Sequence, residues 1–310
     1  MQFIEATDRF PPVGQVVDAA TRHDWPALRQ AIAGIVRTPD DFAQVSLPVS
    51  RIPGVEEWLA PLLEAEPDNN LIAALLIDRL ITLAWDKRSG ALAKNLTPTQ
   101  IVGFTETLLR AEQLLLEQLT RHPADPVLWS LRVTSGRGLG VGLAEIRRRY
   151  RRMYALAPDF YEGASRFLIA LYPKWYGTYD DALAFARERA AGARDGSPLA
   201  ALPVAYYVEQ WRMEPDDDVK ALLARPEVHE ELMIAAHRSV WSPSHVVTPL
   251  TLELHSDLAM LLGIGRWWAD AWPHFRVLGM YPPRAGWDLM ADPPDAYQKF
   301  YLAAQEVAGQ

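Results

Sequence analysis

Apolar residues recur every three or four positions along most of the chain, with polar residues between them. One such stripe includes Ile101, Phe104 and Leu108 and continues to Leu119, with Pro98 just before it. This spacing puts the apolar side chains on one face of an α-helix. Long period-two alternation, the pattern typical of strands, is nearly absent. The pattern therefore predicts an all-α protein with roughly a dozen helices, since start and stop signals recur so often.

Capping residues mark several helix starts. Four residues of types that favour the N-cap lie one or two positions before a proline: Asp24, Thr97, Asp125 and Thr248. Pro61 and Pro273 instead interrupt apolar stripes, so each should kink its helix or mark a boundary. The least regular stretches are 37–53, 86–97, 136–142 and 281–295.

Three similar junctions suggest a repeat. At Pro67, Pro123 and Pro158 an apolar-periodic helix stops at the proline, and another starts within a few residues. Pro123 and Pro158 are 35 residues apart, close to the period of a helix-turn-helix repeat. We therefore expect an α-solenoid of stacked helix pairs, forming one helical-repeat domain over residues 1–310. Residues 1–55 are the candidate for an irregular N-terminal cap.

Composition removes several kinds of chemistry. The 310 residues include no cysteine, which excludes disulfides, thiol nucleophiles and Cys-based metal sites. Lys+Arg 31 against Asp+Glu 39 gives a net charge of −8, so bulk attraction to nucleic acid is not expected. The N-terminus has no signal-peptide pattern, and no apolar run is long enough to span a bilayer. These absences favour a cytoplasmic protein that does not bind membranes.

Short motifs resemble a known family. Tyr172-Pro173-Lys174-Trp175-Tyr176-Gly177 is similar to the Pro-Arg-Trp-Gly-Gly-Ser loop of a bacterial tetratricopeptide-like family of unknown function. The Gly-rich segment 135–140 resembles that family's Arg-Gly-rich turn, and 262–287 resembles its closing helix pair. The likeness covers roughly residues 100–290, with Lys174 in place of an arginine and Tyr176 in place of a glycine. The resemblance implies a fold of helical repeats, and it does not imply any particular activity.

Two residue sets suggest other chemistries. Four glycines occupy alternate positions from Gly136 to Gly142. The backbone amides of this turn could hold an anion together with Arg137. Alternatively, the segment is only a flexible turn between two helices. Five arginines lie within Arg147–Arg152, either as a nucleic-acid patch or as a solvated face with salt bridges.

Five of the seven histidines fall late in the chain. They are His229, His237, His245, His255 and His274, and their spacing is too long for a compact metal motif. Glu230, Glu253 and Asp257 could add carboxylates to a helical metal site, although unrelated surface or core histidines fit the same spacing.

No catalytic set emerges, so the sequence favours a binding or scaffold protein without cofactor or metal. Its partner would be a peptide or protein held in a concave helical groove. The candidate groove residues, chosen as charged anchors and aromatic contact area, are Arg132, Arg137, Arg148, Tyr172, Trp175, Tyr176 and Trp211. One alternative is a metal-dependent enzyme that uses the late histidines. A second is a nucleic-acid binder that uses the Arg147–Arg152 helix.

Overall fold

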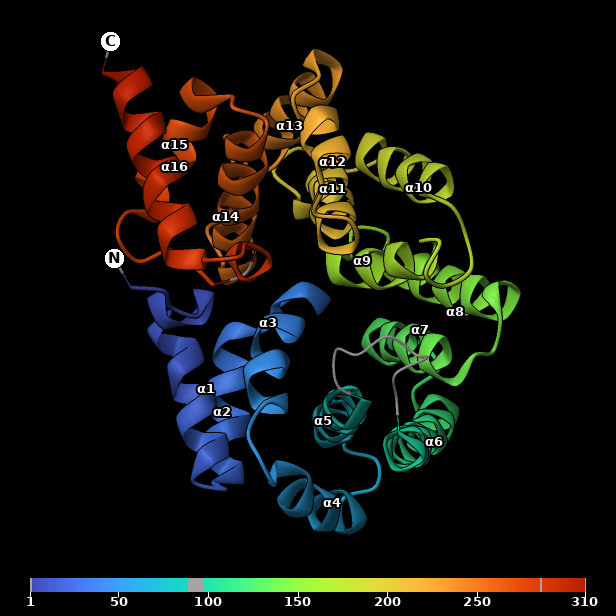
Figure 1. The fold of residues 1–310 in the computed structure, drawn as a ribbon. Coiled ribbons are helices and arrows are strands. Elements are labelled where there is room, and N and C mark those ends of the chain that lie inside the picture. The colour runs from blue at the N-terminus through green and yellow to red at the C-terminus, as the bar shows by residue number, and fades with distance from the viewer. Residues whose placement is uncertain (1, 89–96, 285, 310) are drawn as a thin grey trace. The chain divides into compact units, whose positions relative to one another are not determined.

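Helices make up the regular structure of the chain (Figure 1). The computed structural model describes residues 2–88, 97–284 and 286–309. Within these ranges there are sixteen α-helices and no strand, and the one β-type contact is an isolated bridge between Ile4 and Pro283. The all-helical prediction is confirmed.

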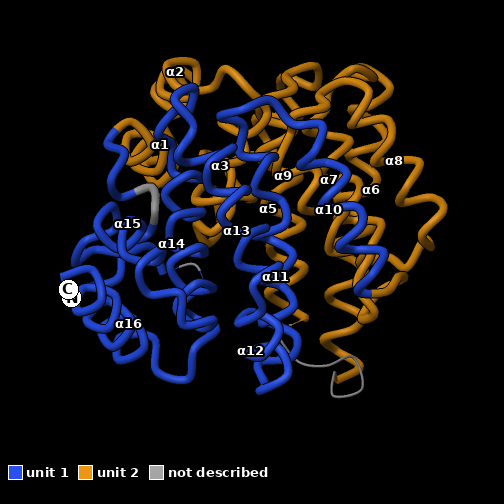
Figure 2. The backbone as a smooth tube through the Cα atoms, turned by 90° about the horizontal axis from the view of Figure 1, so that it is seen from above, with its two compact units in different colours: residues 1–11, 179–310 blue, residues 12–178 orange. Residues whose placement is uncertain are grey.

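The chain forms two compact units, coloured separately in Figure 2. Unit 1 contains Met1–Pro11 and Tyr179–Gln310, and unit 2 contains Pro12–Thr178. The expectation of one domain over residues 1–310 stays a prediction. No stretch rich in Gly, Ser or Pro separates the units at 178–179, so composition gave no sign of the boundary.

Unit 2 is built from the first nine helices. These are α1 (Pro11–Thr21), α2 (Trp25–Ile35), α3 (Pro39–Ser50), α4 (Val55–Ala65), α5 (Asn70–Arg88), α6 (Pro98–Arg121), α7 (Pro126–Leu139), α8 (Leu143–Leu156) and α9 (Tyr161–Ala170). From α4 to α9 each helix packs against the next, and α5 also contacts α7 while α7 contacts α9. Helix α3 touches all three of α5, α7 and α9. Helices α5, α7 and α9 therefore follow one another as neighbours, and α3 packs against all three.

Unit 1 combines the N-terminal segment with the last seven helices. Its elements are the 3-10 helices η1 (Ala6–Arg9), η3 (Pro198–Ala201) and η4 (Trp287–Leu289), with α10 (Tyr179–Ala191), α11 (Leu202–Met213), α12 (Asp217–Leu223), α13 (Pro226–Arg238), α14 (Pro249–Ile264), α15 (Trp268–Leu278) and α16 (Pro293–Ala308). Helix α14 contacts α11, α13, α15 and α16, and most of its residues are buried. It therefore forms the centre of this unit.

The predicted caps start helices as expected. The side chains of Asp24, Thr97, Asp125 and Thr248 each accept a hydrogen bond from a backbone N–H in the first turn of the helix that follows. Thr97 forms a full capping box with Gln100, and the helix it opens ends at Arg121. Pro61 and Pro273 lie inside helices α4 and α15.

Residues 1–55 are not an irregular cap. Helices α1, α2 and α3 occupy most of this range, and α3 covers much of the stretch predicted to be irregular. A capping box between Thr38 and Asp41 starts α3, with Pro39 at its first position. These local signals are present in the sequence, but weak apolar periodicity obscured them.

The glycines of the expected turn have two different roles. Gly136 and Gly138 lie inside α7, not in a loop, and only Gly140 and Gly142, both with positive φ, shape the turn before α8. A Cβ on Gly138 would lie 2.4 Å from Leu108 Cδ1. Gly136 and Gly138 therefore allow close packing of α7. The prediction of a flexible, anion-binding turn is wrong for these two glycines.

In the part of the chain that the structure describes, no helix combines the length and apolar character needed to cross a membrane.

Candidate functional site

The loop after α9 is a tight turn that fixes Trp175. The N–H of Trp175 donates to the carbonyl of Tyr172 over 2.8 Å, and the N–H of Gly177 donates to the same carbonyl over 3.4 Å. A Cβ on Gly177 would lie 2.3 Å from the carbonyl oxygen of Leu171, so a side chain there would collide with backbone. Tyr172 is buried beneath the turn, while Trp175 and Tyr176 stay half-buried.

Trp175 joins aromatic rings from two helices of the same unit. Its ring meets that of Trp85 on α5 edge to face, with centroids 5.9 Å apart and planes at 90°. Trp85 in turn meets Phe104 on α6 with centroids 5.0 Å apart. Edge-to-face pairs of this kind stabilise both rings beyond the area they bury. The turn, α5 and α6 therefore supply one aromatic surface.

Three cations surround these rings. The guanidinium carbon of Arg137 on α7 lies 5.2 Å from the ring centroids of both Trp85 and Trp175. Arg88 on α5 lies 5.4 Å and 5.9 Å from the same two centroids, and the ammonium of Lys174 lies 5.9 Å from that of Trp175. These are cation–π distances. We call the set Trp85, Arg88, Phe104, Arg137, Lys174 and Trp175 the Trp–Arg cluster.

Two cations of the Trp–Arg cluster, Arg88 and Lys174, have no carboxylate partner among the described residues. Among the described residues, neither Arg88 nor Lys174 forms an ion pair with Asp or Glu. The chain segment 89–96 contains no acidic residue. The buried indole Nε1 of Trp85 has no hydrogen-bond acceptor in the described structure. The two cations of Arg88 and Lys174 are therefore available to an anionic group, and a carboxylate suits such donors.

Arg132 and Arg148 belong to ion-pair networks away from this cluster. Arg132 Nε lies 3.0 Å from Glu112 Oε1 with both side chains largely buried, so it stabilises the packing of α7 on α6. Arg148 Nε lies 2.6 Å from Glu145 Oε2 on the surface, and this contact is the first cause that lowers the pKa of Glu145 to about 2. Neither arginine belongs to the Trp–Arg cluster.

Two predicted groove residues are buried and have no place on a docking surface. Tyr172 is 1% exposed and Trp211 is 5% exposed. Trp211 also belongs to unit 1, whereas the other candidates belong to unit 2. Their aromatic character reflects core packing. Of the seven candidates, the structure brings together Arg137 and Trp175. Trp85 and Arg88 could not be found from the sequence, because they lie about 90 positions before Trp175 and carry no local motif.

The basic run on α8 is only partly a free surface. Arg149 is 3% exposed and its guanidinium contacts both Glu112 and Glu145 at 2.9 Å. Arg147, Arg151 and Arg152 are exposed, as is Arg148 in its pair with Glu145. The central arginine of the proposed nucleic-acid patch is therefore structural.

Among the described late histidines, His255 and His274 form one close pair. Nδ1 of His255 lies 2.9 Å from Nδ1 of His274, and Trp241 packs over both rings. Burial lowers the pKa of His255 to about 4 and that of His274 well below its ordinary value, so both rings are neutral near pH 7. Across the described residues, no three His, Cys, Asp or Glu side chains gather as metal ligands do.

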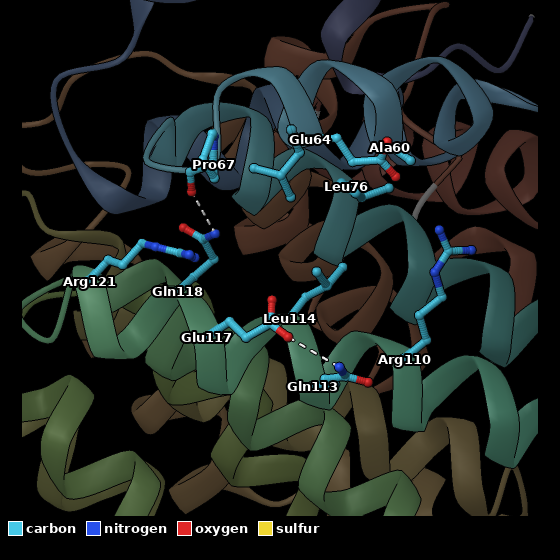
Figure 3. A pocket seen from close by; sticks show the side chains of 11 residues that line it. Ala60, Glu64, Pro67, Leu76, Arg110, Gln113, Leu114, Glu117, Gln118 and Arg121 are labelled. Atoms are coloured by element: carbon cyan, nitrogen blue, oxygen red, sulfur yellow. Dashed lines mark hydrogen bonds between the residues drawn. The ribbon is translucent and has the colours of Figure 1, made fainter.

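A small open pocket lies between α4 and α6, with α5 at its base (Figure 3). Its volume is about 370 Å³. One side of α6 supplies Arg110, Gln113 and Glu117, and the Gln113 amide donates to Glu117 over 3.1 Å. Gln118 closes one end by donating to the carbonyl of Pro67 over 3.0 Å. The lining mixes both charges and contains no arrangement of acid, base and nucleophile.

No protein-family model matches this chain, and no curated protein is detectably similar to it in sequence. The tetratricopeptide-like resemblance therefore stays a prediction.

Proposed function

We propose that this protein is a non-catalytic binding or scaffold protein whose unit 2 is a tetratricopeptide-like solenoid. The packing of α4 to α9 supports this proposal, because each helix contacts the next and α5, α7 and α9 also contact their second neighbours. Stacked helix pairs produce this pattern, since each pair buries its apolar face on the one before it. Solenoids of this kind offer extended surfaces to peptides and protein partners.

The observation that carries the proposal is the Trp–Arg cluster. It places the cations of Arg88, Arg137 and Lys174 on two half-buried tryptophan rings, beside the unpartnered N–H of Trp85. Partly desolvated cations bind carboxylates more strongly than fully hydrated ones, and tryptophan rings supply contact area for apolar groups. The partner is therefore an acidic segment of a peptide or protein with apolar residues beside its carboxylates.

Neither alternative function has a comparable observation in its favour. The metal-enzyme alternative needs ligands in groups of three, and the described histidines meet as a neutral buried pair. The nucleic-acid alternative relies on α8, where Arg149 is committed to two glutamates. The exposed arginines of α8 do provide a direct comparison for the proposed site.

A matched pair of variants tests the proposal. Fluorescence anisotropy measures binding of labelled acidic-aromatic peptides and of length-matched basic peptides, at two salt concentrations. We expect acidic peptides alone to bind, and Arg137→Ala to weaken binding by about ten-fold or more, which corresponds to about 1.4 kcal/mol. The exposed Arg151→Ala should leave binding unchanged. Equal effects of the two variants, or loss only with Arg151→Ala, would refute the assignment of the site.

Trp175→Ala separates a binding role from a structural one. The ring of Trp175 packs on Trp85, so a purely structural clasp would lose several degrees of melting temperature and binding only in proportion. The proposal expects a larger loss of peptide binding than the loss of stability explains. Trp175→Phe keeps most of the aromatic contact, so it should restore stability and part of the binding.

A further inference from the structure

Helix α6 carries an apolar stripe on its solvent face. Val102, Leu109 and Leu116 are 53%, 53% and 48% exposed, and seven residues separate each from the next. Two turns of an α-helix take about seven residues, so the three side chains lie in one line along the helix. Exposed apolar residues are normally scattered singly on a protein surface.

The stripe is separate from the face that α6 uses for folding. Leu108, Ala111 and Leu115 are fully buried and form the inner face of the same helix. At 100° per residue, these positions lie roughly 100–160° around the helix from Leu109. The stripe is therefore not part of the core of unit 2. Its exposed side chains can contact another molecule.

The spacing of the stripe is self-complementary. When a second α6 lies antiparallel with the two-fold axis at Leu109, Leu109 faces its own copy. Val102 then faces Leu116 of the second copy, because both are seven residues from Leu109. A closed two-fold contact requires this property, in which the same patch meets itself.

The charges beside the stripe follow the same symmetry. Glu106 and Arg110 are exposed and lie one turn apart on the same flank of the stripe. Neither forms an ion pair or hydrogen bond within the described part of the chain. In the antiparallel arrangement, Glu106 of each copy comes beside Arg110 of the other, which gives two equivalent ion pairs.

We propose that α6 is a self-association surface through which two copies of this chain form an antiparallel, two-fold symmetric dimer. The 24 residues of α6 extend over about 36 Å, which gives a contact at the small end of specific interfaces. We therefore expect a weak and reversible dimer. The proposal does not depend on the Trp–Arg cluster.

Sedimentation velocity over a micromolar concentration series tests this interface. The expected result is a reversible monomer–dimer equilibrium that Leu109→Glu weakens by at least about ten-fold. Leu302→Glu is the matched control, because Leu302 is 54% exposed on α16 in the other unit. Circular dichroism must show unchanged helicity in both variants. A wild-type monomer at every concentration, or a dimer that Leu109→Glu leaves intact, overturns the proposal.

Charge exchange tests the antiparallel register. Glu106→Arg and Arg110→Glu should each weaken the dimer, because each places like charges together across the interface. The double variant restores opposite charges in both pairs and should recover the wild-type dissociation constant. Failure of the double variant to recover dimerisation would overturn the antiparallel arrangement.

Discussion

Removing the carboxylate of Glu112 should strongly destabilise unit 2. Its Oε1 lies 3.0 Å from Arg132 Nε and 2.9 Å from Arg149 Nη2, and its Oε2 accepts from Ser135 Oγ over 2.5 Å. The side chains of Glu112 and Arg132 are each 12% exposed and that of Arg149 is 4% exposed. One carboxylate thus holds α6, α7 and α8 together through two largely buried guanidinium groups.

The size of the effect follows from what the substitution leaves behind. Glu112→Ala leaves Arg132 without this partner, whereas Arg149 keeps Glu145 at 2.9 Å and the carbonyl of Arg132 at 2.7 Å. Breaking a buried pair by removing one partner costs about 3–5 kcal/mol, and we expect the lower part of that range. Glu112→Gln retains an acceptor of the same shape, so its cost should be about 1.5–3 kcal/mol.

Urea unfolding followed by far-ultraviolet circular dichroism measures these losses as a shift in the transition of unit 2. Glu117→Gln is the matched control on the same helix, since Glu117 is exposed and should change stability by less than about 0.5 kcal/mol. A loss below about 1 kcal/mol for Glu112→Ala would refute the network as a stabilising element of the unit.

Three further predictions concern packing and protonation. Gly138→Ala should cost about 1–3 kcal/mol because its Cβ would lie 2.4 Å from Leu108 Cδ1, whereas Gly14→Ala, with open space around it, should stabilise by up to about 1 kcal/mol; equal melting temperatures for the two variants would contradict this. Leu168 is 1% exposed, so Leu168→Ala should lose about 2–5 kcal/mol in chemical denaturation, and a loss under about 1 kcal/mol would show the site is not tightly packed. Burial lowers the pKa of His255 from 6.5 to about 4, so the stability it contributes is full above pH 6.5 and is lost, by about 3 kcal/mol, as the pH falls toward 4. Thermal unfolding of the wild type and His255→Gln across this pH range checks it, and parallel pH profiles would refute it.

Local signals in the sequence predicted the helices better than their assembly. Thr97 and Gln100 form a capping box whose partners are three residues apart, so the start of α6 could be located from the sequence. The end of α7 could not, because Gly136 and Gly138 read as turn residues. Inside α7 these glycines leave room for α6 and α8, because a Cβ on Gly136 would lie 2.8 Å from Arg149 Nη1 and one on Gly138 would lie 2.4 Å from Leu108 Cδ1. Tertiary packing decided this conformation against local propensity.

The candidate site was predicted in part for a similar reason. Trp175 and Arg137 were visible as unusual residues in a Pro-Trp-Gly loop and a Gly-rich segment. Trp85 and Arg88 were not, because they lie on the long apolar stretch of α5 and join the site only when α5 packs beside α7. Tyr172 shares the loop of Trp175 but points into the core, a difference of orientation that a motif does not specify.

The most direct test of the binding site follows the indole N–H signals of the eleven tryptophans by nuclear magnetic resonance during titration with an acidic-aromatic peptide. Trp85→Phe and Trp175→Phe assign the two signals of the Trp–Arg cluster. The proposal predicts that both signals shift and saturate, and that Arg137→Ala raises the peptide concentration needed for half-saturation by about ten-fold or more. Peptide binding that shifts other tryptophan signals while leaving these two unchanged would contradict it.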